Sequence, residues 1–318
     1  MTTGPFSLVA DIGGTNTRVA LARGATLLHE TISLYKNNDF NCLELILQVY
    51  LAQKNTIVHA VCIAAAGPVA QDVALMTNLD WRIEAANVAR ATGARHVALL
   101  NDLQAQGHAL GRIDSALLLP ILSPKISTSG DKSTKLVVGI GTGFNAAPVH
   151  HVKAGRLVVA SECGHVNLPL SSTEDYDFVK FLQKNHSFVG VEEVLSGRGL
   201  EHLYIYTSQQ ANPKAGSEIM RLIGQDPTCE MAARLFMRFL GAAVGNLALT
   251  HLPFGGIYLC GGVARAFAPY FEPLGFEAAF SEKGRFAPFM AQFSVSLVTD
   301  DFAALTGSAV YLAAEVVL

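Results

Sequence analysis

The segment Leu8–Ala22 constrains the fold of this chain more than any other stretch. It reads LVADIGGTNTRVALA, in which an apolar run ends in one acid, turns at two glycines, offers small polar side chains and becomes apolar again. This pattern predicts a strand, a tight turn and a second strand. The glycines allow positive φ and let a ligand approach the backbone closely, and successive turn N–H groups can hold an anion. For one such turn alone, an ordinary hairpin is the competing interpretation.

A second turn of this kind, GIGTG over Gly139–Gly143, follows another apolar strand predicted at Lys135–Ile140. Two halves built alike could hold the same polyphosphate from two sides. In open α/β sheets, ligands bind outside the carboxyl ends of the strands. Those ends carry acidic, amide and glycine residues, namely Asp11, Asn101, Asp102, Gly141 and Gly261.

Composition limits the kinds of partner. Half of the 318 residues are hydrophobic and only 15% are charged, so the chain can bury a large core in one large or two ordinary domains. The net charge is −3 and there is no basic run, which argues against nucleic acid or an anionic membrane as partner. A phosphate site must therefore be built locally, from backbone amides and helix ends.

The cysteines and the N-terminus indicate a soluble, cytoplasmic protein. None of the five cysteines shows the C-x-x-C spacing of a zinc site or a redox dithiol, and an odd number without a framework fits a reducing compartment. We expect no signal peptide, because no basic segment is followed by a long apolar stretch. We expect no membrane span, because no uninterrupted apolar run reaches about 20 residues.

Strand and helix patterns alternate in the first hundred residues, and helices dominate later. The loop Ser123–Lys135 is rich in Ser, Lys, Thr, Gly and Pro and is expected to mark a domain boundary. The predicted strands are Phe6–Asp11, Thr17–Ala22, Leu27–Leu34, Val58–Ala65, His96–Leu100, Lys135–Ile140, Ile257–Cys260 and Ser294–Val298. The predicted helices are Asn41–Gln53, Ile83–Thr92, Leu103–Leu110, Thr173–Lys184, Glu192–Tyr206, Pro213–Ile223, Cys229–Leu252 and Asp301–Ala314.

Asp102 is the strongest candidate for a catalytic residue. It ends an apolar strand and precedes a predicted helix. One interpretation is a helix N-cap, a position that Asp and Asn favour. The other is a general base that accepts the proton of a substrate hydroxyl while the hydroxyl oxygen attacks phosphorus. In that case Asn101 could bind a neighbouring hydroxyl.

Glu162 and His165 lie close together in the segment ASECGHV, where a turn can direct both at one ligand. Fixed polar groups of this kind can recognise a diol with a specificity that apolar contacts lack. Metal ligation or a surface pair is the alternative, although zinc needs a third ligand that is not evident nearby. Glu192 is either a further ligand or a favourable acid in the first turn of a helix.

Gly261 and Gly262 follow a short apolar strand. The pair is either a plain turn or a place where adenine and ribose lie on the backbone. Neither glycine turn continues into the Gly-Lys-Ser/Thr of a P-loop. The H-R-D and D-F-G motifs of protein kinases are also absent.

In their order along the chain, these motifs resemble those of bacterial glucokinase, of the hexokinase–actin–heat-shock ATPase superfamily. The similarity extends over nearly the whole chain. The segments that carry it are DIGGTNTR (Asp11–Arg18), LLND (Leu99–Asp102), GIGTG (Gly139–Gly143), ECGH (Glu162–His165), EEVLSG (Glu192–Gly197), LCGG (Leu259–Gly262) and EKGRF (Glu282–Phe286).

The resemblance implies an α/β, two-domain actin-like ATPase (ribonuclease H-like) fold with a central cleft. It implies a small domain of residues 1–112 plus 302–318 and a large domain of residues 113–301. It also implies transfer of the γ-phosphoryl of ATP to the 6-hydroxyl of a hexose, most simply glucose. A homodimer is usual in this family, so we expect one here.

The same resemblance assigns roles to the candidate residues. Asp102 is the base, and the sugar-binding residues are Asn101, Asp102, Glu162, His165 and Glu192. Asp11 lies near Mg²⁺ and its waters. The nucleotide is held by Gly13, Gly14, Thr15, Asn16, Gly141, Thr142, Gly143, Gly261 and Gly262.

The chain departs from the family pattern at Asn145, where a glycine is usual, and in Thr299–Phe302, which lacks the usual proline. A side chain at Asn145 could narrow the nucleotide cleft or shift its selectivity. The alternatives are therefore a kinase for another sugar, such as mannose or an amino sugar, and a non-catalytic sugar or nucleotide sensor. The phosphoryl donor is open between ATP and polyphosphate. The cysteine-rich zinc signature of the related repressor–kinase family is absent.

Overall fold

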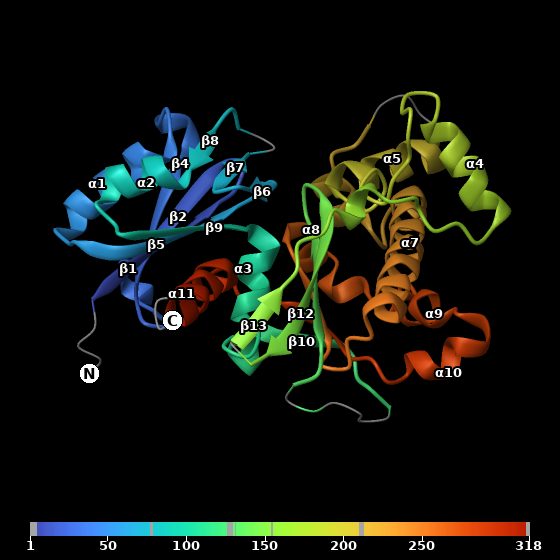
Figure 1. The fold of residues 1–318 in the computed structure, drawn as a ribbon. Helices are drawn as coiled ribbons and strands as arrows, with labels where there is room; N and C mark the ends of the chain where they lie inside the picture. Colours follow the sequence, from blue (N-terminus) through green and yellow to red (C-terminus); the bar gives the residue numbers. More distant parts are fainter. Residues whose placement is uncertain are drawn as a thin grey trace. The chain divides into compact units, whose positions relative to one another are not determined.

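The computed structural model describes residues 5–76, 79–125, 130, 132–153, 155–209 and 213–315. The chain divides into two compact units (Figure 1). Unit 1 comprises Met1–Ser115, Val152–Ala160 and Asp300–Leu318, and unit 2 comprises Ala116–His151 and Ser161–Thr299. From the sequence we expected divisions after residues 112 and 301. The return of Val152–Ala160 to unit 1 was not anticipated.

Unit 1 is built on a sheet of order β3-β2-β1-β5-β9, in which β4 also pairs with β2. β1 is antiparallel to β2 and parallel to β5, and β5 is parallel to β9. The carboxyl ends of β1, β5 and β9 therefore lie at one edge of the sheet. The strands are β1 (Phe6–Ile12), β2 (Asn16–Arg23), β3 (Thr26–Leu27), β4 (Ser33–Lys36), β5 (Val58–Ala65) and β9 (His96–Asn101).

The central strands of unit 1 are apolar throughout because helices cover both faces of the sheet. Leu8 and Ala10 share a buried cluster with residues of α1 (Leu43–Lys54) and α2 (Ala85–Thr92). Val9 points the other way, into a cluster with residues of α3 (Asp102–Ala109) and α11 (Ala303–Glu315). The red α11 lies beside α3 in Figure 1. The two helices pack so closely that a Cβ at Gly307 would lie 1.6 Å from the Ala105 carbonyl oxygen.

Unit 2 is built on the strand order β10-β15-β14-β11-β12. β11 is antiparallel to β12 and parallel to β14, which is parallel to β15. The strands are β10 (Leu118–Leu122), β11 (Lys135–Ile140), β12 (Phe144–Val152), β14 (Ile257–Cys260) and β15 (Val295–Val298). The helices around them are α4 (Thr173–Leu182), α5 (Gly197–Ser208), α6 (Gly216–Leu222), α7 (Pro227–His251), α8 (Gly262–Ala266), α9 (Phe276–Ser281) and α10 (Ala287–Met290).

Helix α7 is the central core helix of unit 2. It begins after Asp226, whose carboxylate accepts from the N–H groups of Thr228 and Cys229. A Cβ at Gly241 would lie 2.7 Å from the Ala279 Cβ on α9, so the expected close helix packing is confirmed. By length and composition α7 could cross a membrane, but 67% of its apolar window is buried within the protein, as in a soluble core helix.

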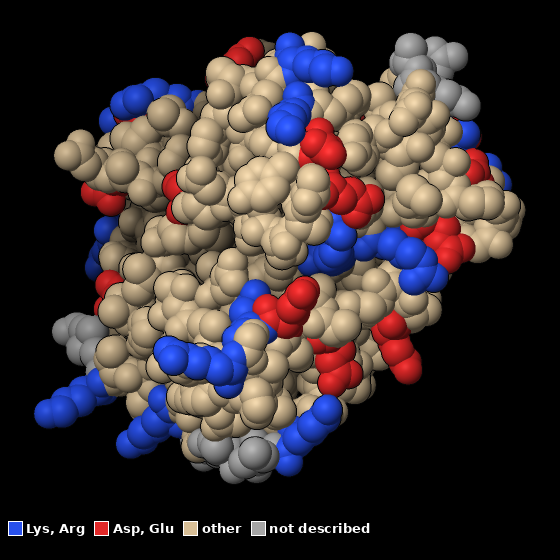
Figure 2. Space-filling model, turned by 90° about the vertical axis from the view of Figure 1, so that its right-hand side faces the viewer, with Lys and Arg blue, Asp and Glu red and all other residues tan. Residues whose placement is uncertain are grey.

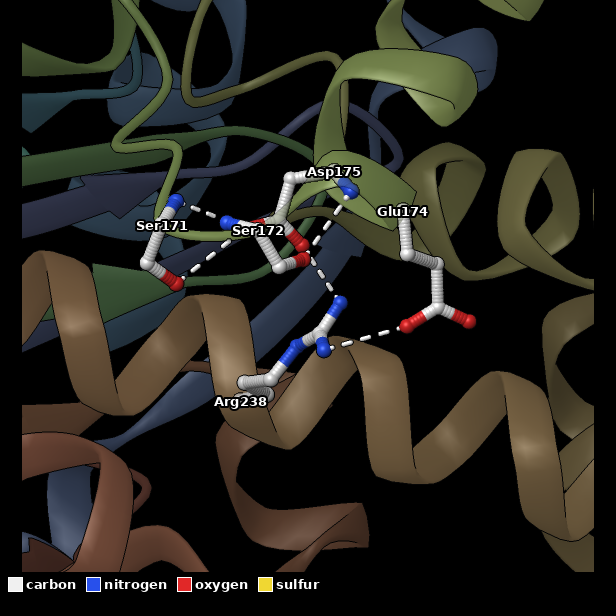
Figure 3. A network of polar contacts seen from close by, with 5 residues as sticks. All are labelled: Ser171, Ser172, Glu174, Asp175 and Arg238. Carbon is white, nitrogen blue, oxygen red and sulfur yellow. Dashed lines mark hydrogen bonds and ion pairs between the residues drawn. The ribbon is translucent and has the colours of Figure 1, made fainter.

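An ionic network joins α4 to α7 (Figure 3). Asp175 closes a capping box with Ser172 at the start of α4 and also accepts from Ser171. Its carboxylate, only 2% exposed, is paired with Arg238 of α7, which also reaches Glu174. The N-terminal end of α4 is therefore anchored to the core helix.

Several predicted boundaries were wrong. The strand expected at Leu27–Leu34 is interrupted by a 3-10 turn, because the Thr31 hydroxyl accepts from Leu21 N–H and bends the chain. The helix expected from Ile83 begins at Ala85, after the short strand β8 (Arg82–Glu84). The helix expected from Glu192 begins at Gly197, where the Ser196 hydroxyl caps it.

The domain boundary expected in Ser123–Lys135 was also wrong. The strands on either side of that loop, β10 and β11, lie in the same unit, and the chain changes unit between Ser115 and Ala116. Residues 126–129 and 131 of the loop lie outside the described residues.

Four further short strands of unit 1 are described. Strands β6 (Val69–Ala70), β7 (Val73–Leu75) and β8 form an antiparallel sheet, and β13 (Gly155–Val158) lies in the returning segment. The Val158 carbonyl accepts from the Gln104 amide of α3 at 3.2 Å.

Charge is mixed over the face drawn in Figure 2, where basic and acidic side chains alternate on a mostly uncharged surface. No broad basic field covers that face.

Candidate active site

The first glycine turn joins β1 to β2 and is held in place by hydrogen bonds with Asn37. Gly13 N–H donates to the Asn16 carbonyl at 3.0 Å. The buried Asn37 amide donates to the Gly13 carbonyl at 2.8 Å and accepts from the Thr17 hydroxyl at 2.7 Å. Asn37 N–H also donates to the Thr15 carbonyl. The sequence analysis missed Asn37, which directly follows β4.

Positive φ does not explain the glycines at the start of the two turns. Neither Gly13, Gly14 nor Gly141 has a positive φ. A Cβ at Gly13 would make only an ordinary contact, and one at Gly141 would meet nothing within 4 Å. The backbone of these turns is therefore open rather than unusual in conformation, which suits a ligand that approaches the amides directly.

Asp11 is the last residue but one of β1, close to the first turn. Its carboxylate, 18% exposed, is 3.4 Å from the guanidinium of Arg18. Burial raises the pKa of Asp11 above its ordinary value, and the Arg18 charge opposes that rise.

Asp102 is the first residue of α3, and the interpretation of it as the N-cap was wrong. Asn101 is the cap: its Oδ1 accepts from Leu103 N–H, and the Gln104 side chain accepts from Asn101 N–H. Asp102 Oδ1 accepts from Leu103 N–H at 2.9 Å. Burial, and then the nearby Asp11 carboxylate, raise the pKa of Asp102 to about 6.

The Asn101 side chain is partly used by the fold. Besides capping α3, its amide donates to the Gly67 carbonyl at 3.1 Å. Gly67 has no room for a side chain, since a Cβ would lie 2.0 Å from the Leu75 carbonyl oxygen. Asn101 therefore locks the end of β9 to the loop after β5, beside the two carboxylates.

In unit 2, the second glycine turn accommodates Glu192. Phe144 N–H donates to Glu192 Oε2 at 3.0 Å. A Cβ at Gly143 would lie 2.5 Å from that oxygen, so glycine is required here to admit the carboxylate. Glu192 precedes α5 and is not part of its first turn, which excludes the helix-end interpretation.

The segment that carries Glu162 and His165 lies against the same end of β12. Gly164 packs so closely on Phe144 that a Cβ would lie 2.0 Å from its carbonyl oxygen. Glu192 N–H donates to the Gly164 carbonyl at 2.8 Å, and His165 N–H donates to the Glu162 carbonyl at 3.1 Å. The side chains of Glu162 and His165 are exposed. The structure thus brings two predicted sugar-binding segments, Glu162–His165 and Glu192–Gly197, to the second glycine turn.

Asn145 is tied to this segment rather than directed at the phosphate turn. Its Oδ1 accepts from Cys163 N–H and from the Ser161 hydroxyl, both at 3.1 Å. Its amide donates to the Ser161 carbonyl and lies 3.4 Å from Glu162 Oε2. These bonds hold the side chain against residues 161–163. The narrowing of the nucleotide site by Asn145 stays a prediction.

Gly261 and Gly262 differ in what they contribute. Gly261 has a φ of +99°, and a Cβ there would lie 2.3 Å from the Ile140 carbonyl oxygen, so the fold itself requires glycine. Gly262 begins α8 and faces open space. Because β11 and β14 are parallel, this pair lies at the same sheet edge as the second glycine turn.

These features define the class of protein: a kinase with the two-domain, actin-like α/β fold. A family model described as Glucokinase matches residues 8–315. The chain belongs to the glucokinase family, as its sequence motifs had indicated.

Individual relatives agree with this assignment. The chain is 34% identical to glucokinase of Pectobacterium atrosepticum, covering 96% of this chain and 97% of the relative. It is 31% identical to glucokinase of Erwinia tasmaniensis over the same shares. Among solved structures, a glucokinase from an Antarctic psychrotroph superposes with a TM-score of 0.85 at 30% identity, covering 97% of this chain and 98% of the other.

The chain is therefore a glucokinase-like hexose kinase, which phosphorylates a hexose with ATP. A ROK-family glucokinase of Streptomyces griseus, solved with glucose and AMPPNP, shares the fold with a TM-score of 0.65 at 20% identity. It covers 96% of this chain and 98% of the other, and at this identity it supports the fold alone.

Proposed function

We propose that this protein transfers the γ-phosphoryl group of ATP to the 6-hydroxyl of glucose, with Asp102 as the general base. Membership of the glucokinase family supports the substrate pair. The observation that carries the base assignment is the Asp102 carboxylate at the carboxyl edge of the unit 1 sheet, with its pKa raised to about 6. A base with such a pKa is largely ionised at neutral pH and still accepts a proton effectively.

The sugar oxygen forms a bond to the γ-phosphorus while the bond from that phosphorus to the β–γ bridging oxygen breaks. The hydroxyl proton passes to Asp102, and ADP leaves with the bridging oxygen. Such transfers depend mainly on positioning and charge stabilisation.

The sugar is proposed to be held by Asn101, Glu162, His165 and Glu192. Carboxylates accept hydrogen bonds from sugar hydroxyls, and an imidazole can donate or accept. The bonds of Glu192 to Phe144 and of Asn145 to the 161–163 segment support this role, because they fix the carboxylates before substrate arrives.

The nucleotide is proposed to lie on open backbone. Gly13, Gly14, Thr15 and Asn16 would contact phosphates from unit 1, and Gly141, Thr142 and Gly143 from unit 2. Gly261 and Gly262 would face adenosine. Open space above Gly141 and Gly262 supports this proposal.

The residues present also fit Mg²⁺. Asp11 and Asp102 bring two carboxylates to one sheet edge, the pKa of each is raised, and the charge of Arg18 offsets only part of this on Asp11. An oxygen-rich, electron-rich edge suits a hard divalent cation that keeps most of its waters. We propose that Asp11 holds Mg²⁺ through water, and that the bound ion neutralises charge on the phosphate oxygens.

The sensor alternative rested on Asn145, whose side chain is accounted for by its bonds to residues 161–163. A kinase for another hexose remains the second candidate. The expected homodimer and the expected cytoplasmic location also remain predictions. Analytical ultracentrifugation would measure the oligomeric state.

The test combines a sugar panel with one substitution. ADP release is measured with glucose, mannose and glucosamine, each with and without Mg²⁺. We expect glucose to be preferred and Asp102→Asn to reduce kcat about 10²-fold or more while glucose binding persists. Near-normal turnover by the variant would exclude Asp102 as the base. A preference of at least tenfold for another sugar over glucose would show that glucose is not the main substrate.

A further inference from the structure

His186, Glu193 and His202 form a cluster of metal-ligating side chains in unit 2 that the proposed reaction does not use. Each offers one ligand atom, and these atoms all lie within 4.8 Å of one another. His186 follows α4, Glu193 lies in the loop before α5, and His202 is on α5. All three side chains are partly buried.

The spacing within the cluster fits a tetrahedral ion. His186 Nδ1 is 3.4 Å from Glu193 Oε2. Two ligands about 2.0–2.1 Å from a zinc ion at the tetrahedral angle are about 3.4 Å apart. The rings of His186 and His202 are also adjacent, with centroids 5.1 Å apart in an edge-to-face arrangement. The ligand atoms of all three residues lie within 4.8 Å of one another.

A second, independent feature prepares His202 as a ligand. Its Nδ1 lies 3.0 Å from the backbone carbonyl oxygen of Glu193. A carbonyl oxygen can only accept, so Nδ1 must carry the proton and Nε2 of the neutral ring keeps its lone pair. Metal-bound histidines almost always show such a bond from the other ring nitrogen, which fixes both tautomer and ring orientation.

We propose that His186, Glu193 and His202 form a binding site for Zn²⁺, with water completing the coordination. Two imidazoles and one carboxylate are a typical zinc set, whereas Mg²⁺ prefers oxygen ligands alone. The site would tie the C-terminal end of α4 to α5 and to the loop that carries Glu192. The opposite end of α4 is already fixed to α7 by Asp175 (Figure 3).

Equilibrium dialysis with Zn²⁺ as the probe tests the site. The buffer contains excess Mg²⁺ as a competitor and no sugar or nucleotide. We expect one tightly bound Zn²⁺ per chain, and an affinity at least about tenfold weaker in His202→Gln and in Glu193→Gln. His151→Gln is the matched control, because His151 is an exposed histidine of unit 2 outside the cluster, and it should bind as the unaltered protein does. Equal Zn²⁺ affinity in His202→Gln would overturn the proposal.

Two further readouts keep the test decisive. Co²⁺ in place of Zn²⁺ should give visible bands without the thiolate charge-transfer absorption that binding to a cysteine would produce. Hydrogen exchange over residues 186–202 should slow on adding Zn²⁺ to the unaltered protein and stay unchanged in His202→Gln. A thiolate signal, or protection elsewhere only, would refute the assignment. None of these measurements depends on kinase activity, so failure here leaves the proposed function untouched.

Discussion

Helix α3 carries a partly buried carboxylate, Asp102, and a buried imidazole, His108, whose effects on stability have opposite pH dependence. Burial raises the pKa of Asp102 from 3.8 to about 6. Burial, with the Arg156 charge, lowers the pKa of His108 from 6.5 to about 4. The ionised form is disfavoured in both cases, but ionisation occurs at high pH for the acid and at low pH for the imidazole.

Each shift corresponds to about 3 kcal/mol of folding free energy at its limit. For Asp102 the folded pKa is raised, so its penalty is absent below pH 3.8 and grows to its full size as pH rises past about 6. For His108 the folded pKa is lowered, so its penalty is absent above pH 6.5 and grows as pH falls towards about 4. Between pH 4 and 6 the pH dependences of the two penalties nearly cancel, because the Asp102 penalty grows as the His108 penalty falls, and their sum stays at about 3 kcal/mol.

Removing one of the two ionisable groups should reveal the pH dependence of stability that the other contributes. Asn in place of Asp102 imitates the neutral acid and can still accept from Leu103 N–H. Asp102→Asn should therefore be more stable than the unaltered protein by about 1 kcal/mol at pH 4.5 and about 3 kcal/mol at pH 8. His108→Gln should show the reverse, with its gain confined to low pH.

Urea unfolding followed by tryptophan fluorescence measures this directly, because the single tryptophan, Trp81, lies in unit 1 with both groups. The comparison is made with a chelator present and without substrates. Using differences between variant and parent cancels all other titrating groups. A difference for Asp102→Asn that does not change between pH 4.5 and 8 would refute the raised pKa and, with it, the physical basis of the proposed base.

Three further substitutions test the contacts that shape the site and the core. Asn37→Ala leaves the Gly13 carbonyl and the Thr17 hydroxyl without their partner. It should lower the free energy of unfolding, measured in urea, by about 2 kcal/mol and raise the KM for ATP. The control is Asn38→Ala, an exposed position, which should change the free energy of unfolding by no more than about 0.5 kcal/mol. Asn145→Ala should raise the glucose KM about tenfold, the equivalent of one lost hydrogen bond, with the KM for ATP unchanged; a shift in the ATP value instead would contradict the contact with residues 161–163. Arg238→Met should lower the free energy of unfolding by about 3 kcal/mol, because it leaves the Asp175 carboxylate buried without its partner. The exposed pair Arg234–Glu230 provides the control. Arg234→Met should lower the free energy of unfolding by about 0.5 kcal/mol.

The sequence located residues whose position follows from strand ends. Asp11 and Asp102 end or follow apolar runs in parallel strands, so pattern alone brought them to one edge of one sheet. Glu192 was also a candidate from the sequence, but the helix that follows it was predicted to begin too early. Acids before a helix are a start signal, but Ser196 was the actual cap.

What the sequence could not reveal depends on contacts between distant segments. Asn37 reaches back 24 residues to Gly13, and Asn145 reaches 18 residues forward to Cys163. Polar residues of this kind are common in loops, and no periodicity or spacing marks them. The His186–Glu193–His202 cluster has no sequence signature either, because its ligands meet only once α4 and α5 have packed.

Glu192 and Glu193 are neighbours in sequence, and one loop thereby belongs to both of the proposed sites. Glu192 contacts the second glycine turn, and Glu193 contacts His186 and His202. If Zn²⁺ orders this loop, less conformational freedom is lost when sugar binds to Glu192, so glucose should bind more tightly with Zn²⁺ present. Calorimetry without nucleotide, which would otherwise chelate the ion, measures this in the unaltered protein and in His202→Gln. Tightening in both proteins would trace the effect to zinc bound elsewhere, and tightening in neither would separate the two sites.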